Sequence, residues 1–236
     1  MNSMQRLGGA CAIVVGISYI LIGLTYFLLP VAQQPGQPVG PFLASYAENP
    51  TFTRLLWWEL ALGAIFAVAA VLAIQDSVRQ GGEALARWTG NLAIIGYAVT
   101  ALTSFRALAL QPDIAAAYVA ADASAKTAIA ATGITQLDPE GWLTFGAVGV
   151  WALTSSVLML RTTAFPRMLG YVGIAVGVLY MLIVAGQVLA IQSLIAVAAG
   201  LGGVVAAPIW FIGTGISLRR GETAQTAPAR SPAAIR

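Results

Sequence analysis

Glu59 and Arg106 are the only acidic and the only basic residue inside long apolar stretches of this chain. A guanidinium group binds a carboxylate or a phosphate through two parallel hydrogen bonds. A carboxylate beside it can serve as counter-ion or as proton acceptor. Because charged side chains are costly in a bilayer, the two residues mark the candidate functional site.

The rest of the composition excludes several kinds of chemistry. The chain has no histidine, one cysteine (Cys11) and one lysine (Lys126). Histidine-ligated haem, histidine zinc sites, Ser–His hydrolases and iron–sulfur clusters are therefore excluded. No phosphate-binding glycine loop of the P-loop type occurs. The sequence predicts no catalytic residues, no metal and no cofactor, and an enzyme is the least favoured class.

The elements that must position the charged pair are membrane-spanning helices. Of the 236 residues, 58% are hydrophobic and 9% are charged, whereas about a quarter are charged in soluble domains. A span needs about 20 apolar residues, and all spans must be helical in lipid. We predict an all-α, polytopic membrane protein with six transmembrane helices, over residues 7–29, 55–74, 88–110, 142–160, 168–189 and 194–218.

The distribution of basic residues predicts the orientation. One set of boundaries carries nine arginines, whereas the opposite set carries Arg54, Lys126 and the intramembrane Arg106. Positive residues stay inside, so both termini are expected to be cytoplasmic in a cell (plasma or inner) membrane. The net charge of +3 comes mostly from these arginines and does not indicate a nucleic-acid partner. Residues 1–220 form the membrane domain, and 221–236 are predicted to be a disordered cytoplasmic tail.

Three of the predicted helices open with the same signature. Arg6, Arg87 and Arg167 lie 81 and 80 residues apart, and each is followed three residues later by glycine. Tyr19 and Tyr180 also match within the first and fifth spans. The pattern predicts three parallel helical-hairpin repeats. Coincidence remains the alternative, because arginine is common at an inner boundary and glycine is common in membrane helices.

The Arg-x-x-Gly opening resembles a broad group of bacterial six-span membrane proteins that is known only as a domain of unknown function. The closing Pro208-Ile209-Trp210-Phe211, followed by Gly215 and Leu218-Arg219, is similar to the end of that group's last helix. The resemblance covers Arg6 to Arg219 and implies the six-span fold. It implies no activity.

The topology places Glu59 and Arg106 at one depth. Each lies four residues from the outer end of its span, about 6 Å below the boundary at 1.5 Å per residue. Six uncharged polar residues fall in the same layer, and each is a candidate for lining an outward-opening chamber: Thr25, Tyr26, Thr103, Ser104, Thr144 and Gln187. The eight residues form the candidate ligand site. The alternative is a structural salt bridge near the headgroups.

Two loop features and one proline within a predicted span also yield predictions. The alanine-rich segment Asp113 to Ala131 is expected to form a helix with Asp113 near its N-cap. Asp138-Pro139 is expected to start the fourth helix, with Asp138 as N-cap and Pro139 in the first turn. Pro208 is expected to kink the sixth helix.

The function predicted from these observations is a non-enzymatic membrane module. It would bind a lipid or small anionic amphiphile in the outer half of the bundle, as a small transporter, a sensor or an accessory subunit. The alternative is a structural subunit of a larger membrane complex, with a membrane-protein partner or a second copy of the chain bound through its small-residue faces.

Overall fold

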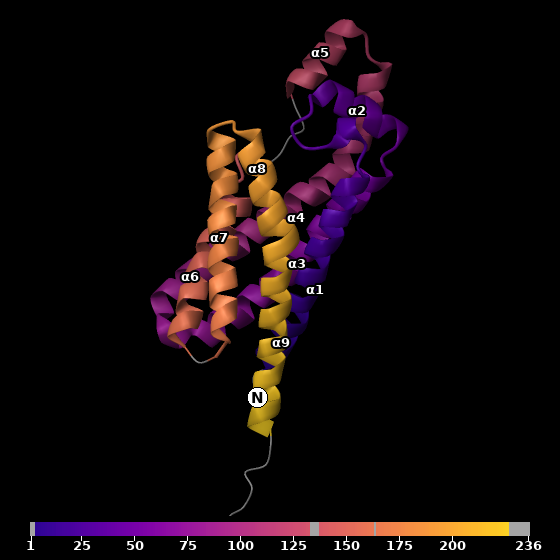
Figure 1. The fold of residues 1–236 in the computed structure, drawn as a ribbon. Helices are drawn as coiled ribbons and strands as arrows, with labels where there is room; N and C mark the ends of the chain where they lie inside the picture. The colour runs from indigo at the N-terminus through magenta and orange to yellow at the C-terminus, as the bar shows by residue number, and fades with distance from the viewer. Residues whose placement is uncertain (1–2, 133–136, 163, 227–236) are drawn as a thin grey trace, which may run out of the picture.

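The computed structural model describes residues 3–132, 137–162 and 164–226, and these ranges contain helices but no strands. Six of the helical segments are long and apolar enough to cross a membrane (Figure 1). The prediction of an all-α protein with six membrane-spanning helices is confirmed. The remaining elements are two short helices and two single turns of 3₁₀ helix between the long segments.

The first three long segments are single helices, α1 (Ser3–Leu28), α3 (Thr51–Val78) and α4 (Glu83–Ala120). The fourth begins as the π-helical turn η3 (Trp142–Ala147) and continues as α6 (Val148–Arg161). The fifth is α7 (Arg167–Val188). The sixth runs through α8 (Gln192–Ala199), the π-helical η4 (Gly200–Ala206) and α9 (Ala207–Thr226). The short elements are η1 (Val31–Gln33), α2 (Val39–Glu48), η2 (Arg79–Gly81) and α5 (Ala123–Thr132).

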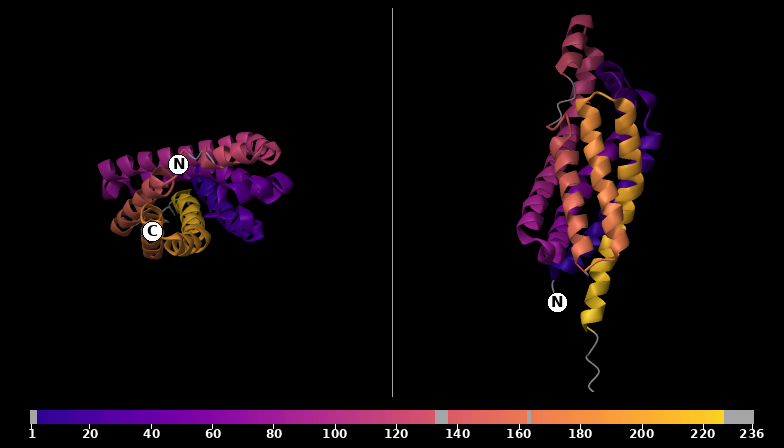
Figure 2. Two further views of the ribbon diagram at one scale, coloured as in Figure 1. Left: turned by 90° about the horizontal axis from the view of Figure 1, so that it is seen from above. Right: turned by 60° about the vertical axis from the view of Figure 1, so that its left-hand side comes forward.

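The bundle has two distinct ends. α1 begins and α9 ends at the same end, which we call the N/C end (Figures 1 and 2). The short helices α2 and α5 lie at the other end, which we call the α2/α5 end. The predicted orientation would place the N/C end in the cytoplasm, and it stays a prediction. α9 ends at Thr226, and the remainder of the predicted tail lies outside the described residues.

The glycine of each Arg-x-x-Gly signature lies at a contact with a neighbouring helix. The contacts join α1 to α9, α4 to α3 and α7 to α6. A Cβ added at Gly9 in α1 would lie 3.0 Å from the carbonyl oxygen of Gly215 in α9. At Gly170 in α7 it would lie 3.2 Å from the carbonyl oxygen of Ser156 in α6, and at Gly90 in α4 it would overlap a side chain of α3. Gly9 and Gly170 thus allow close approach to a backbone carbonyl of the neighbouring helix, whereas Gly90 makes room for the side chain of Gln75.

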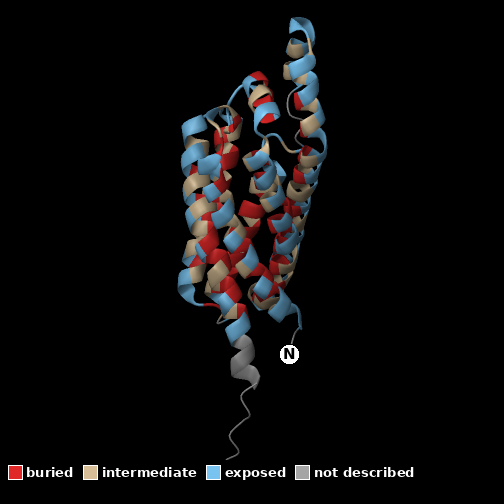
Figure 3. Ribbon diagram, turned by 90° about the vertical axis from the view of Figure 1, so that its right-hand side faces the viewer, coloured by how far each residue is buried: buried red, intermediate tan, exposed pale blue. Residues whose placement is uncertain are grey.

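Aromatic rings fill the centre of the bundle. The rings of Trp151 in α6 and Trp210 in α9 lie 5.2 Å apart, and that of Phe211 lies 5.0 Å from Trp210. Tyr19 of α1 stacks on Phe211, and Tyr97 of α4 meets Trp151 edge to face. Buried residues line the inside of the bundle and exposed ones its outside (Figure 3). This distribution suits a protein whose outer surface contacts lipid.

The prediction of a separate helix starting at Asp113 is wrong. α4 passes through Pro112 and Asp113 without a break and ends at Ala120. A proline within a helix removes one hydrogen bond, and here packing of the neighbouring residues Gln111 and Ala115, both buried, holds the helix together. The cap of the next helix is Asp122, whose Oδ1 accepts a hydrogen bond of 2.8 Å from the N–H of Ala125.

Asp138 caps the fourth span, as predicted, but it lies further from the start of the helix in the sequence than an ordinary N-cap residue. Its Oδ2 accepts hydrogen bonds from the backbone N–H groups of Leu143 (2.9 Å) and Thr144 (2.7 Å). The expected place of Pro139 in the first turn is wrong, because the helix begins only after Gly141, which has a φ of +70°. The chain needs this left-handed glycine to turn from the loop into the helix.

The last hairpin turns at Leu189–Ile191, between α7 and α8. Pro208 lies just after the π-helical turn η4. A proline cannot donate a backbone hydrogen bond, and a wider turn next to it is a common way for a helix to adapt.

Candidate functional site

Glu59 lies in the part of α3 nearer the α2/α5 end, where it meets α1. The hydroxyl of Thr25 donates a hydrogen bond of 3.1 Å to Glu59 Oε1. Glu59 Oε2 is buried and has no hydrogen-bond partner among the described residues. The structure thus brings two of the predicted site residues together and leaves one buried oxygen of a partly buried carboxylate group without a described partner.

The periodicity of α3 explains which way Glu59 faces. Residues two apart on a helix point about 200° apart, so Trp57 and Glu59 lie on opposite sides of α3. Trp57 faces α4, because its indole N–H donates a hydrogen bond of 2.9 Å to Gln111 Oε1. Glu59 therefore faces α1, and α3 stands between Glu59 and α4.

Arg106 is not brought to Glu59. It lies on α4 with an exposed side chain, and within the described ranges no ion pair joins it to Glu59. Equal depth along two neighbouring helices was a sound inference from topology. Depth does not determine the direction in which each side chain points around its helix, and here the two directions differ.

The other predicted site residues do not gather around Glu59. Tyr26 is exposed on α1, next to the buried Thr25. The hydroxyl of Ser104 is buried but donates to the carbonyl of Thr100 in its own helix, at 2.8 Å. The remaining three are partly buried on their own helices: Thr103, Thr144 and Gln187.

A polar network that the sequence did not indicate ties the α2/α5 end together. Gln33 is buried, and its amide nitrogen donates hydrogen bonds of 3.0 Å both to Ser45 Oγ and to the carbonyl of Asn49. Its amide oxygen accepts a hydrogen bond from the hydroxyl of Thr53. One glutamine thus joins η1, the end of α2 and the start of α3. A glutamine in a proline-rich loop carries no signal of this role.

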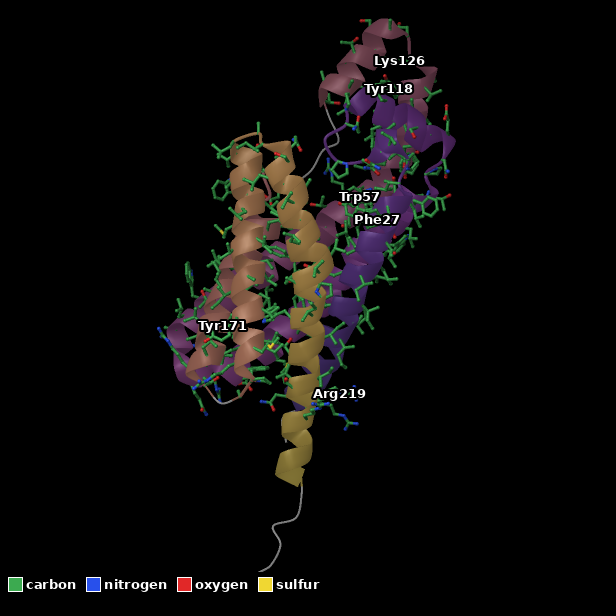
Figure 4. The ribbon with its side chains drawn as sticks, viewed as in Figure 1. Phe27, Trp57, Tyr118, Lys126, Tyr171 and Arg219 are labelled. Carbon is green, nitrogen blue, oxygen red and sulfur yellow. The ribbon has the colours of Figure 1, made fainter. Side chains whose placement is uncertain are left out.

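Two further buried side chains at this end have unsatisfied polar atoms. Gln111 Nε2 on α4 and the hydroxyl of Tyr46 on α2 are buried and have no partner among the described residues. Burial raises the pKa of the Tyr46 hydroxyl, against the opposing effect of nearby Arg54. The phenol is therefore neutral and able to donate a hydrogen bond at physiological pH. Figure 4 labels Trp57, whose indole is the partner of Gln111.

The centre of the bundle also buries polar atoms without described partners. They belong to neutral side chains of α6 and α9, namely Trp151, Ser155, Ser156 and Trp210. A Cβ added at Gly173 of α7 would overlap both Ser156 Oγ and Trp210 Nε1. Ser156 and Trp210 are thus packed directly against α7. Within the described ranges, no three His, Cys, Asp or Glu residues gather in a way that could hold a metal ion.

The fold and the apolar character of its long helices define a polytopic, all-helical membrane protein. The model of one protein family, described as "Domain of unknown function (DUF4386)", matches residues 9–215. The chain belongs to this family, as its opening and closing motifs indicated. Comparison with curated proteins and with solved structures finds no match.

Proposed function

We propose that the protein is a non-enzymatic membrane module that binds a lipid or small amphiphile in the half of the bundle near its α2/α5 end. The observation that carries the proposal is the buried Oε2 of Glu59, which has no partner among the described residues. A carboxylate in an apolar stretch is stabilised by hydrogen-bond donors. Thr25 supplies one donor, and the ligand would supply the other.

The geometry favours a ligand with an amine or hydroxyl group. The anionic amphiphile suggested by Arg106 would require that residue and Glu59 to share one site, whereas α3 separates them. A primary ammonium group donates hydrogen bonds and carries the charge that complements a carboxylate. The ligand class that suits Glu59 is therefore an amphiphile with a primary amine, such as a phosphatidylethanolamine.

The test compares two lipids that differ only in this donor. Dihexanoyl-phosphatidylethanolamine is expected to bind the purified protein more tightly than dihexanoyl-phosphatidylcholine, which has no N–H. Glu59→Gln should weaken binding of the first lipid at least about tenfold, since a hydrogen bond to a charged group contributes about 1.5–3 kcal/mol. The matched control is Glu83→Gln, because Glu83 is exposed at the N/C end. Equal binding of both lipids by the unmodified protein would contradict the proposal.

The second candidate is a structural subunit of a larger membrane complex. One observation favours it: the end of α4 and the whole of α5 project beyond the rest of the bundle (Figure 1). None of the residues of α5 is buried, so its surface is open to a partner. Purification of the protein from its native membrane as a stable monomer would count against this candidate.

The orientation is part of the proposal as well. The nine arginines at one set of boundaries support cytoplasmic termini in the cell membrane. A single cysteine placed in α5, in a chain whose Cys11 is changed to serine, should react with a membrane-impermeant maleimide in intact cells. Labelling only after lysis would reverse the proposed orientation.

A further inference from the structure

At the junction of α2, α3 and α4, hydrogen-bond donors gather on the side of α3 opposite Glu59. Gln111 on α4 is only 2% exposed. Its amide oxygen accepts the 2.9 Å hydrogen bond from the Trp57 indole, which has a donor only. That bond fixes the orientation of the Gln111 amide, because a flipped amide would place its NH₂ group against the indole N–H of Trp57. Gln111 Nε2 is consequently held in a buried place with two N–H groups and no described acceptor.

Tyr46 brings a second donor to the same junction. Its side chain is 2% exposed, and its hydroxyl has no described partner. It belongs to a buried cluster with Phe42, Leu43 and Ala115. Ala115 lies one helical turn after Gln111 on the same face of α4, so Tyr46 and Gln111 both lie where α2 packs on α4.

An arginine lies near this junction. Arg54, at the start of α3, is exposed but is close enough to Tyr46 to act on its hydroxyl electrostatically. The acidic residues nearest in sequence, Glu48 on α2 and Asp113 on α4, are both exposed. Each lies two positions after Tyr46 or Gln111, so it points to the opposite side of its helix. The junction thus holds a buried amide and a buried neutral phenol, with an exposed guanidinium group nearby, and all three are donors.

We propose that the junction of α2, α3 and α4 is a second binding site, which takes a phosphate group through Gln111, Tyr46 and Arg54. A phosphate offers several acceptor oxygens and negative charge, which match two neutral donors beside an arginine. The group comes either from a phospholipid headgroup or from free phosphate. The site lies across α3 from Glu59 and does not depend on the amine-binding role proposed there.

The test measures the melting temperature of the full-length protein in phosphate-free detergent. The probes are dihexanoyl-phosphatidylglycerol, inorganic phosphate and, as the neutral comparison, dihexanoylglycerol. We expect stabilisation by at least one of the two phosphate-bearing probes and none by dihexanoylglycerol. Stabilisation by the lipid alone identifies a headgroup as the source, and stabilisation by both shows that phosphate itself is sufficient.

Two variants probe the site from different helices. Tyr46→Phe removes only a hydroxyl that has no described protein partner, so the protein should fold and bind at least about tenfold more weakly. Gln111→Glu keeps an acceptor for Trp57, removes the donors and adds a repelling charge, so it should abolish binding. If Gln111→Glu does not fold, Tyr46→Phe decides the matter.

The controls are Tyr171→Phe, an exposed tyrosine of α7 in the half of the bundle nearer the N/C end (Figure 4), and Glu59→Gln. Both should bind the phosphate-bearing probe as tightly as the unmodified protein. The proposal is overturned if neither phosphate-bearing probe stabilises the protein, or if Tyr46→Phe binds with unchanged affinity. Loss of binding in Glu59→Gln would overturn the separation of the two sites.

Discussion

The centre of the bundle and its α2/α5 end both bury polar atoms without described partners, but they differ in charge and in packing. In the centre the side chains are neutral, and Ser156 and Trp210 pack directly against Gly173. At the α2/α5 end the side chains with unsatisfied polar atoms include the carboxylate of Glu59, and Arg54 lies near another of them, Tyr46. Glu59 is also the only acidic residue within the apolar part of any span.

The comparison separates two reasons for burying a polar atom. A buried indole or hydroxyl group left without a hydrogen bond costs about 1–3 kcal/mol, which close packing around it can offset. A buried carboxylate costs more, because an ionised group needs several donors or a counter-charge. Ser156 and Trp210 in the centre lie directly against Gly173 and are therefore part of the packing, whereas the groups at the α2/α5 end are candidates for binding.

Filling the close contact in the centre should have the largest effect on stability. Gly173→Leu would force side-chain atoms into Ser156 and Trp210, and overpacking of this kind costs about 3 kcal/mol. The measurement is the melting temperature in detergent. Gly203→Leu is the matched control, because nothing lies within 4 Å of a Cβ added there. Equal effects of the two substitutions would show that the centre is not closely packed.

Breaking the network at the α2/α5 end should have a smaller and more local effect. Gln33→Ala removes the hydrogen bonds to Ser45, Asn49 and Thr53, which should cost about 2 kcal/mol. Hydrogen exchange should accelerate in α2 while the centre stays protected. Gln34→Ala, the same change one residue further on, should leave exchange in α2 unaltered. Faster exchange throughout the bundle would show that the two regions unfold together.

Removing the one described donor to Glu59 should cost less. Thr25→Val keeps the shape of the side chain and leaves both carboxylate oxygens without a described partner, which should destabilise the protein by about 1 kcal/mol. Thr103→Val on α4 is the control, with no change expected. If the proposed amine ligand is bound at Glu59, adding it should restore part of the lost stability, as a shift in the denaturation midpoint.

The smallest effect is expected at the cap of α5. Asp122→Ala should destabilise this helix by about 0.5 kcal/mol, because the side chain caps the N–H of Ala125. Hydrogen exchange of the amides in the first turn of α5 measures it. Asp113→Ala should have no effect on α5, since Asp113 lies within α4. Faster exchange in α5 after Asp113→Ala, with no change after Asp122→Ala, would instead support the sequence-based prediction that Asp113 caps the helix of this loop.

Hydropathy was sufficient to predict the six spans and the turn region of the last hairpin, because lipid imposes length and apolar character on each span. The continuation of α4 through Pro112 was not predictable. A proline usually ends a helix, and only the packing around Gln111 and Ala115 opposes that tendency.

The candidate site was predicted in part. The sequence indicated Glu59 and Thr25 by their type and depth, and the structure joins them. It also suggested Arg106, but depth does not tell which way a helix is turned about its own axis. Gln33 and Gln111 could not be found at all, because their roles depend on loops and on a helix contact that no local pattern encodes.

The contact between α1 and α9 has a consequence for how the protein is made. Gly9, Gly16 and Gly23 of α1 all face the last span, where a Cβ at Gly16 would lie 3.1 Å from the carbonyl oxygen of Pro208. α1 leaves the ribosome before α9. The glycine face of α1 therefore stays uncovered until the sixth span is inserted, because η4 and α9 of that span are what cover it. A chain truncated before α9 would leave this face uncovered for membrane quality control to detect.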